Sequence, residues 1–379
     1  MKAVIAIDSF KGSLSSLCAA AAVKEAMTEV FPEGEALVFP IADGGEGTVD
    51  ALVKGLSGKE CRVSVSGPLG KRVEAVYGII DGTAVMEMAA AAGLPLLTKE
   101  ERNPLYTTTR GVGEMILDAL DSGCRSFIIG IGGSATNDGG SGMLKALGFG
   151  LFDSKGKEIP DGAIGLSKIA RISTEGVRPE LYDCKFSIAC DVKNPLCGEL
   201  GCSAVFGPQK GADEKSVALM DSYLEKFLCV TKSLFPDADG NFPGSGAAGG
   251  LGFAFRTFLF GELKPGISLI LDKIGIEEEI KDADIVITGE GRLDSQTVMG
   301  KAPSGVAAIA KKYGVPTVAF AGALASDAEM CNEGGIDAFF PIIRKITSLE
   351  EAMDENTARE NLKATAKQVF LLLKSFKGL

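Results

Sequence analysis

Short apolar runs alternate with amphipathic stretches along most of the chain, which is the pattern of an α/β protein. Each apolar run leads into a loop of Gly, Asp, Ser or Asn, and a stretch with helical spacing follows. Because parallel strands need a crossover connection, the alternation predicts a mainly parallel sheet covered by helices. The predicted strands of this kind are 2–8, 36–42, 126–132, 185–192, 284–290, 316–322 and 338–343. The predicted helices are 16–30, one ending at residue 54, 111–121, one beginning near residue 138, 213–231, 249–261 and 301–313.

The segment between residues 61 and 89 has a different pattern. Three runs in it come closer to strict alternation, which predicts antiparallel strands at CRVSVSG (61–67), RVEAVYGII (72–80) and TAVMEMA (83–89). We therefore expect an α/β fold with two domains and an active site in the cleft between them. One is a doubly wound, mainly parallel domain of the flavodoxin or Rossmann kind, and the other is an inserted domain with a mixed sheet. Their expected bounds are 1–60 plus 280–379 for the first and 61–279 for the second.

The C-terminal stretch predicts one long helix. It opens with a capping box, in which Ser348 stands three residues before Glu351. Apolar residues then recur with the spacing of an amphipathic helix, at positions 349, 352, 353, 362, 366, 369, 370 and 373.

The composition excludes several kinds of chemistry. The 379 residues include no histidine and no tryptophan. Without histidine there is no Ser-His-Asp or Cys-His nucleophile system, no imidazole base and no zinc site with a histidine ligand. Acid–base work must therefore come from carboxylates, lysines, tyrosines or thiols. The 49 glycines are nearly twice the average share, which indicates many special backbone positions.

Charge and cysteine usage narrow the partners and the compartment. Lys and Arg number 39 against 50 Asp and Glu, and the net charge of −11 disfavours a nucleic-acid partner. The N-terminal apolar run is too short for a signal peptide, and no stretch reaches the ~18 apolar residues of a membrane span. The nine cysteines include no CxxC pair, which favours reduced thiols in a cytoplasmic protein. A metal cluster is the alternative for the four that lie closest together, Cys184, Cys190, Cys197 and Cys202.

Five predicted strands run directly into polar loops. Loops at the carboxyl ends of parallel strands build the active sites of open α/β sheets. Gly, Asp and Asn also dominate ordinary turns, so one such loop means little, whereas five of this density favour a binding site. The five junctions are IAID-SFKGS, PIA-DGGEGT, IIGIG-GSATNDGG, IACD-VKNP and VITGE-GRLDSQ.

The densest loop, GIGGSATNDGG (130–140), predicts a phosphate cradle. Its glycines let backbone N–H groups approach an anion, and a helix N-terminus after them favours negative charge. The chain has no Walker A sequence, but Lys301 stands at a predicted helix start and is a further candidate for phosphate. The expected phosphate- and nucleotide-binding residues are Gly132, Gly133, Ser134, Thr136, Asn137 and Lys301.

Carboxylates gather at the predicted strand ends, where they can hold Mg²⁺ or accept a proton from a hydroxyl nucleophile. Asp191 closes the apolar strand IACD, so partial burial is expected to raise its pKa and suit it as the general base. Lys11 lies between hydroxyl residues and suits a carboxylate or phosphate oxygen. The expected catalytic residues are Asp191, Lys11 and Asp8. The expected substrate-binding residues are Ser9, Lys11, Ser13, Asp43, Asn194 and Arg292, and the expected metal ligands are Asp43, Glu290 and Asp294, with Glu46 a further strand-end carboxylate.

Nine segments, taken in their order along the chain, are more specific than any one of them. They are DSFKGSLS, IADGGEGTVDALV, VSGPLG, TTTRGVGE, IGIGGSATNDGGSGML, ACDVKNPLCG, VFGPQKGA, GAAGGLG and ADIVITGEGRLDSQTVMGKAPSGVA. From Lys2 to about Phe340 the chain resembles the bacterial glycerate kinase family, type I. The resemblance implies two α/β domains, ATP-dependent phosphorylation of D-glycerate, usually at the 2-hydroxyl, and Mg²⁺ as cofactor. The residue roles given above rest on strand-end position and side-chain type, since the resemblance alone does not assign them.

Two other functions stay open on the sequence alone. An NAD-dependent oxidoreductase of a small hydroxy acid is suggested by Gly130, Gly132 and Ala135, which match G-x-G-x-x-A after a strand. Such an enzyme often uses a histidine, which this chain lacks. Asp153 stands near the position of the expected acidic residue, but it lies in a predicted turn and not at a strand end. A non-catalytic sugar-acid sensor would need no carboxylates at the strand ends. For the kinase we expect 2-phosphoglycerate rather than 3-phosphoglycerate, glycerate and ATP as partners, and no nucleic acid or membrane; a homodimer is left open.

Overall fold

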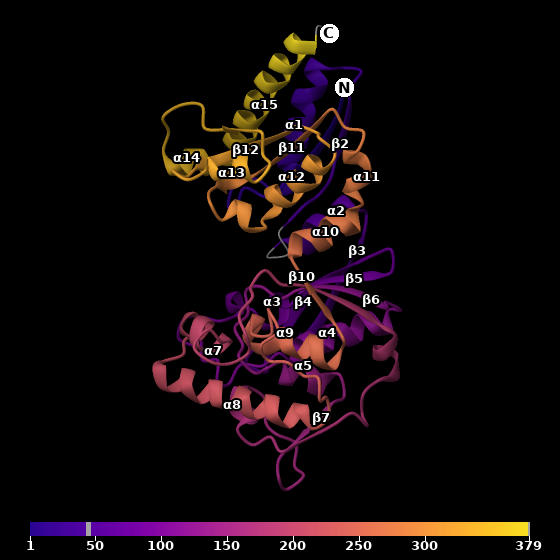
Figure 1. Cartoon of the computed structure of the whole chain (residues 1–379), viewed down its shortest axis with the longest axis vertical. Coiled ribbons are helices and arrows are strands. Elements are labelled where there is room, and N and C mark those ends of the chain that lie inside the picture. Colours follow the sequence, from indigo (N-terminus) through magenta and orange to yellow (C-terminus); the bar gives the residue numbers. More distant parts are fainter. Residues whose placement is uncertain (43–46, 378–379) are drawn as a thin grey trace. The chain divides into compact units, whose positions relative to one another are not determined.

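The computed structural model describes residues 1–42 and 47–377 and divides into two compact units (Figure 1). Unit 1 is discontinuous and comprises Met1–Asp43, Asp50–Ser57 and Ile267–Leu379. Unit 2 comprises Gly44–Val49 and Gly58–Gly266. Each unit has its own sheet and its own apolar core.

The sheet of unit 1 is entirely parallel. Its strands are in the order β13-β12-β11-β1-β2, which is 5-4-3-1-2 in the order along the chain. This is the flavodoxin-like order, and its switch point lies between β1 and β11, where open α/β sheets bind ligands. The prediction of a doubly wound parallel sheet is therefore confirmed. The strands are β1 (Lys2–Ile7), β2 (Glu35–Val38), β11 (Ile285–Leu293), β12 (Thr317–Leu324) and β13 (Ala338–Pro341).

Helices cover both faces of this sheet, as the alternation of side chains along its strands requires. Phe320 packs in the cluster of α1 (Ser16–Val30) and α15 (Glu355–Lys377), whereas its neighbour Ala319 packs with Ala307 of α12 on the other face. Figure 1 shows α1 and α15 side by side. The remaining helical elements of unit 1 are α2 (Thr48–Gly55), α10 (Gly266–Ile274), α11 (Ile276–Ile280), η4 (Thr297–Met299), α12 (Ala302–Lys312), α13 (Met330–Glu333) and α14 (Leu349–Met353).

The prediction of one long final helix is wrong, because the chain forms two helices there. Ser348 caps only the short α14, its Oγ accepting a hydrogen bond from the N–H of Glu351 at 3.1 Å. Asp354 then adopts an extended backbone conformation, and its Oδ2 accepts from the N–H of Thr357 at 2.9 Å. A second N-cap inside the apolar pattern thus ends one helix and starts the next, α15.

The sheet of unit 2 is mixed, as predicted. Its strands are in the order β10-β9-β6-β5-β4-β3; the pairs among β3, β4 and β5 are antiparallel, and those from β5 to β10 are parallel. The strands are β3 (Lys59–Ser66), β4 (Arg72–Ile80), β5 (Thr83–Glu87), β6 (Ser126–Gly130), β9 (Lys185–Ala189) and β10 (Glu262–Lys264), with a separate pair β7 (Gly150–Phe152) and β8 (Arg171–Ser173).

The helices of unit 2 enclose a core rich in phenylalanine. Phe127 of β6 stacks on Phe186 of β9 with ring centroids 4.8 Å apart, and Phe227 of α8 stacks on Phe258 of α9. The elements are α3 (Ala89–Ala92), η1 (Leu94–Leu96), α4 (Arg110–Asp121), α5 (Ser141–Ala146), α6 (Ala163–Leu166), η2 (Pro179–Asp183), α7 (Cys202–Phe206), η3 (Pro208–Lys210), α8 (Glu214–Lys232) and α9 (Ala247–Phe258). Across the described residues of both units, no helix combines the length and the apolar character that a membrane crossing needs.

Candidate functional site

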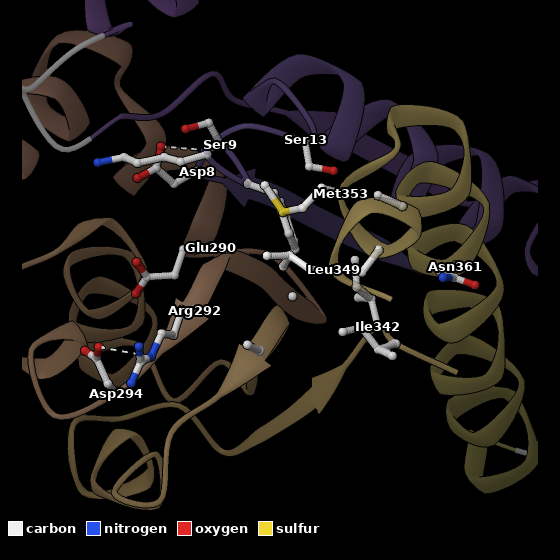
Figure 2. Close-up of a pocket in the computed structure, with 18 of the residues that line it drawn as sticks. Asp8, Ser9, Ser13, Glu290, Arg292, Asp294, Ile342, Leu349, Met353 and Asn361 are labelled. Carbon is white, nitrogen blue, oxygen red and sulfur yellow. Dashed lines mark hydrogen bonds and ion pairs between the residues drawn. The ribbon is translucent and has the colours of Figure 1, made fainter. Parts of the chain in front are cut away.

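A cavity of about 380 Å³ lies in unit 1 at the carboxyl ends of β1 and β11 (Figure 2). It therefore stands at the switch point of the sheet, where this strand order leaves room for a ligand. In Figure 2 the labelled charged residues gather on one side of the view, and Ile342, Leu349 and Met353 gather on the other. Eight of the residues predicted for the site line this cavity: Asp8, Ser9, Lys11, Ser13, Glu290, Arg292, Asp294 and Lys301.

The loop after β1 supplies the first group. Asp8 is buried, and its Oδ1 accepts a hydrogen bond from the N–H of Ser9 at 2.6 Å. Phe10 inserts into the core, and its carbonyl accepts from the N–H of Leu14, so the intervening Lys11 is turned outward and exposed. Gly12 has a φ of +81°, and a Cβ there would come within 2.9 Å of Met353 Cε. The tight turn therefore needs glycine and packs directly against α14.

The end of β11 supplies the second group. Glu290 is only 9% exposed, and its Oε1 accepts a hydrogen bond from Thr297 Oγ1 at 2.7 Å. Lys301 directly precedes α12, and its Nζ lies 3.7 Å from both Glu290 Oε2 and Asp294 Oδ1. Because two carboxylates converge on one ammonium, Lys301 is part of an ion-pair cluster rather than a solvated charge.

Arg292 lies on the strand and not in a loop, because β11 continues to Leu293, three residues beyond its predicted end. The extension pairs Arg292 with Ala323 of β12, and the Arg292 Nε lies 3.7 Å from Asp294 Oδ2. A Cβ at Gly322 would lie 2.7 Å from the carbonyl oxygen of Gly291, so glycine is needed where these two strands approach. The pairing therefore holds the Arg292 guanidinium, which is largely exposed, at the cavity.

The apolar side of the cavity has no distinguishing pattern in the sequence. It includes Phe10, Ile342, Leu349 and Met353, and Leu349 is 79% exposed. The apolar spacing at 349, 352 and 353 predicts one face of a long amphipathic helix, yet α14 buries none of its residues. The available signal was the position of these residues after the last strand, at the same carboxyl edge of the sheet as Asp8 and Glu290.

In unit 2, the loop after β6 divides into an exposed and a buried half. Gly132 and Gly133 are exposed, whereas Ser134, Thr136 and Asn137 are buried, the last two completely. Asn137 Nδ2 donates to Ser203 Oγ at 2.8 Å. The exposed glycines offer backbone N–H groups, and the remaining predicted phosphate-binding side chains of this loop face the interior.

Two buried charges hold the inner half of this loop. The Asp138 carboxylate accepts from the N–H and Oγ1 of Thr109 and from the N–H groups of Gly140 and Gly142, at 2.9–3.1 Å, while burial raises its pKa. Lys210 Nζ donates to the carbonyl oxygen of Thr136 at 2.7 Å, and burial lowers the pKa of Lys210 to about 8. This part of the loop is therefore held by hydrogen bonds to the surrounding elements of unit 2.

The glycine-rich first turn of α9 packs against the same loop. Ala248, Gly249 and Gly250 all have positive φ, and a Cβ at Gly249 would lie 2.1 Å from the carbonyl oxygen of Thr136. The N–H of Gly139 donates to the carbonyl of Gly249 at 2.9 Å. Close backbone approach is therefore what the glycine at 249 provides.

The dinucleotide fingerprint lacks its structural context. Gly130 ends β6, but the next helix, α5, begins only at Ser141, so the glycines do not open a helix. Asp153 lies in a turn, where its Oδ1 accepts from the N–H groups of Lys155 and Lys157. This geometry does not support a Rossmann-type pyrophosphate site at the loop.

Asp191 is exposed, so the expected partial burial is wrong. The strand ends at Ala189, and the residue that turns inward is Cys190, whose thiol pKa is raised by burial. Asp191 Oδ1 accepts from the N–H of Gly266 at 3.0 Å. Asn194 Nδ2 donates to the carbonyl of Leu200 at 2.9 Å and so holds its own loop.

Two of the predicted carboxylates, Asp43 and Glu46, lie outside the described residues. Within residues 1–42 and 47–377, no three His, Cys, Asp or Glu side chains are arranged to hold a metal ion. Glu290 and Asp294 are the two predicted ligands that the structure does bring together, around Lys301.

Known proteins resemble the chain over its full length. A sequence profile of the glycerate kinase family matches residues 3–374. Glycerate 2-kinase of Escherichia coli (strain K12) is 49% identical over 93% of both chains, and glycerate kinase of Bacillus subtilis (strain 168) is 47% identical over 100% of this chain and 99% of that protein. A crystal structure of a candidate glycerate kinase 2 from Salmonella typhimurium LT2 superposes with a TM-score of 0.92, at 45% identity, and covers both chains completely. The chain is therefore an ATP-dependent kinase and belongs to the glycerate kinase family.

Proposed function

We propose that the protein transfers the γ-phosphoryl group of ATP, with Mg²⁺, to the 2-hydroxyl of D-glycerate, giving 2-phosphoglycerate and ADP. Family membership supports glycerate as the acceptor, and the Escherichia coli relative is named a 2-kinase. The observation that carries the proposal is the polar side of the unit 1 cavity. Three cationic and three carboxylate side chains meet there at the switch point of a parallel sheet: Lys11, Arg292 and Lys301 with Asp8, Glu290 and Asp294.

Phosphoryl transfer needs positioning and charge neutralisation more than covalent help from the protein. Lys301 and Lys11 are the proposed partners of the phosphate oxygens, and the exposed backbone of Gly132 and Gly133 is a further proposed phosphate contact. Lys301 Nζ now lies near the carboxylates of Glu290 and Asp294. In the proposed complex the ammonium binds the phosphates of ATP instead, and the two carboxylates can then bind a metal cation.

Glu290 and Asp294 are the proposed carboxylates for Mg²⁺, with Asp43 as a third. Both supply the hard oxygen atoms that Mg²⁺ prefers, and one or two carboxylates suffice because substrate phosphates and water complete its coordination. The carboxylates of Glu290 and Asp294 both lie near the ammonium group of Lys301. The same two carboxylates therefore suit a metal cation when the ammonium group binds phosphate. When bound, Mg²⁺ would neutralise charge on the transferred phosphoryl group.

The glycerate hydroxyl needs a proton acceptor, and Asp191 is the proposed base. Because Asp191 is exposed, burial gives no reason to expect a raised pKa. The proposal therefore rests on the position of Asp191 just after the parallel strand β9. Asp8 is the competing candidate for the base, because it is a carboxylate that lines the cavity, whereas Asp191 does not line it. Lys11 or Arg292 is proposed to bind the glycerate carboxylate, with Ser9, Ser13 and Asn194 as further substrate contacts.

A coupled assay tests the reaction directly. Purified protein is incubated with ATP, Mg²⁺ and D-glycerate while ADP release is followed, and the phosphorus spectrum of the product separates 2-phosphoglycerate from 3-phosphoglycerate. Glycerate-dependent ADP release and the 2-phosphate are expected. Absence of ADP release at saturating glycerate would refute the proposal, and NADH oxidation with a keto acid would restore the oxidoreductase alternative.

A further inference from the structure

The two sides of the unit 1 cavity differ in chemistry. Its polar side carries the charged residues of β1, β11 and the start of α12, whereas its apolar side is built by the chain after β13 and by α14. D-Glycerate has an oxygen on each of its three carbons and therefore presents almost no apolar surface. Burying those oxygens against an apolar wall without hydrogen bonds would cost free energy. The apolar side thus calls for a second, less polar chemical group.

We propose that this apolar side, formed by Ile342, Leu349 and Met353, binds the purine nucleoside of ATP. The inference rests on the proposed function, because it assigns one of the two substrates of that reaction to this wall. A cavity of about 380 Å³ is within the range of roughly 300–1,000 Å³ found for small-molecule sites, which are mostly apolar with a few convergent polar groups. A flat aromatic base has the shape and low polarity that such a wall accommodates.

The exposure of the wall supports a ligand. Leu349 is 79% exposed and Met353 is 39% exposed, although both line the cavity. Apolar surface left in water forgoes the free energy that its burial would yield, and more of the Leu349 side chain is exposed than of the Met353 side chain. A base packed against these side chains would remove apolar surface of both partners from water. Met353 is also the side chain that meets Gly12, so the wall directly adjoins the turn that carries Lys11.

The polar side then receives the phosphates. Lys11 and Lys301 line the same cavity as the apolar wall, which places cationic groups within one ligand-sized space. Lys301 also stands at the N-terminus of α12, an eleven-residue helix whose positive end favours anions. One nucleotide can thus use both sides of the cavity, the base on the wall and the phosphates at the strand ends.

Asn361 of α15 offers a group that can recognise the edge of the base. It lines the cavity, and its side-chain amide makes no hydrogen bond with the described residues. An amide presents one acceptor and two donor hydrogens, which match the amino group and an adjacent ring nitrogen of adenine. Asn361 is therefore the proposed source of preference for adenine.

The test uses Leu349→Ser in the full chain, with Ile346→Ser as the matched control. Ile346 lies three residues away, is fully exposed and does not line the cavity. Binding of ADP is measured by calorimetry without glycerate, and KM is measured separately for ATP and for glycerate. Leu349→Ser is expected to weaken ADP binding and to raise the KM for ATP by about tenfold, with the KM for glycerate within about twofold of the parent. Ile346→Ser should leave the ADP affinity and both KM values unchanged. Leu349→Met, which keeps an apolar side chain, should have values close to those of the parent.

The outcomes separate this inference from the proposed function. Unchanged ADP binding in Leu349→Ser, or a rise in the KM for glycerate alone, would overturn the nucleoside site while glycerate phosphorylation stands. If Leu349→Ser weakens ADP binding but the parent protein forms no ADP from ATP and glycerate, the proposed reaction is refuted and the nucleoside site stands. Asn361→Leu should bring the kcat/KM values for ATP and ITP closer together, and an unchanged ratio would remove Asn361 from base recognition.

Discussion

The loop after β1 in unit 1 and the loop after β6 in unit 2 look alike in sequence but differ in what their polar groups do. Both follow a buried parallel strand and are rich in Gly, Ser and Asp or Asn. In unit 1 the side chains of Lys11 and Asp8 line a cavity. In unit 2 the side chains of Asn137 and Asp138 face the interior and are completely buried.

The difference shows that a polar loop at a strand end can serve either a ligand or the fold. The Asp138 carboxylate accepts four hydrogen bonds from Thr109, Gly140 and Gly142, so its acceptor capacity is used within unit 2. One Glu290 oxygen accepts a hydrogen bond from Thr297 and the other lies 3.7 Å from Lys301 Nζ, at the cavity where the proposed function places the phosphates. Substitutions in the two regions should therefore separate catalysis from stability.

The largest effect is expected for Asp191→Asn. Loss of a general base should lower kcat by about 10²- to 10⁴-fold while ADP binding measured by calorimetry is retained. Asp8→Asn is the comparison in unit 1. Near-normal turnover of Asp191→Asn, together with an inactive but folded Asp8→Asn, would transfer the base role to Asp8.

Lys301→Met should lower kcat/KM by about 100-fold, because it removes a cationic group that the proposal places at the phosphates. The midpoint of thermal unfolding is measured alongside, because Lys301 also neutralises Glu290 and Asp294 and its loss can lower stability. Lys312→Met is the matched control on the same helix: that lysine pairs with Glu277 at 2.6 Å and does not line the cavity. Equal activities of the two variants would argue against a phosphate contact by Lys301.

Asp138→Ala should reduce stability rather than turnover per folded molecule. Four buried donors lose their acceptor at once, which is expected to lower the free energy of unfolding by about 3 kcal/mol. Urea denaturation measures the change, and Asp213→Ala, which removes the exposed N-cap of α8, should cost only about 1 kcal/mol. A loss no larger than that of the cap would mean that Asp138 does not hold the loop.

Lys210 predicts a pH dependence in unit 2. Its folded-state pKa of about 8 lies below the ordinary value of 10.5, so between these pH values the unfolded chain binds more protons than the folded one. The free energy of unfolding should therefore rise with pH across this window, by at most about 1.4 kcal/mol per pH unit. Lys210→Met should abolish this slope relative to the parent, as measured by urea denaturation from pH 7.5 to 10.5. An identical slope in both proteins would show that Lys210 stays charged in the folded state.

The smallest effect is expected for Glu29 on the surface of unit 1, which has no proposed role in either loop. Lys363 and Lys367 of α15 hold the pKa of Glu29 at about 2, below its ordinary 4.5, through hydrogen bonds at 2.8 and 2.7 Å. The contribution of this carboxylate is present above pH 4.5 and is lost as pH falls through 2. Glu29→Gln should flatten that part of the stability curve slightly, with turnover at pH 7 unchanged. A clear loss of turnover would contradict a purely structural role.

Much of the fold followed from local pattern. The predicted helix 16–30 coincides with α1, where Ser15 supplies the N-cap, and the predicted strand 72–80 coincides with β4. Period and caps are set by neighbours in sequence, so they can be interpreted without the rest of the chain. The break at Asp354 was missed because the apolar spacing continues across it while a polar cap decides the outcome.

The candidate site was harder to predict, because burial depends on the surrounding fold. Lys11 and Glu290 were singled out by their positions at strand ends and Lys301 by its position at a helix start, and all three line one cavity. Such positions could not tell that Asp191 would be exposed and Thr136 fully buried, since neighbouring elements decide which side of a loop faces the interior. The wall around Leu349 escaped notice because an apolar residue beside a cavity has the same sequence pattern as one in a core.

The discontinuity of unit 1 has a consequence for synthesis on the ribosome. The middle strand pair of its sheet joins Ala3 of β1 to Ile285 of β11, so β1 is made long before its partner. Residues 58–266 of unit 2 are a continuous segment and are complete before β11 emerges. Because contacts so distant in sequence form slowly and domains fold as units during translation, unit 2 is expected to fold first. The cavity would then be among the last parts of the chain to form, so a truncated product would lack the site even with unit 2 intact.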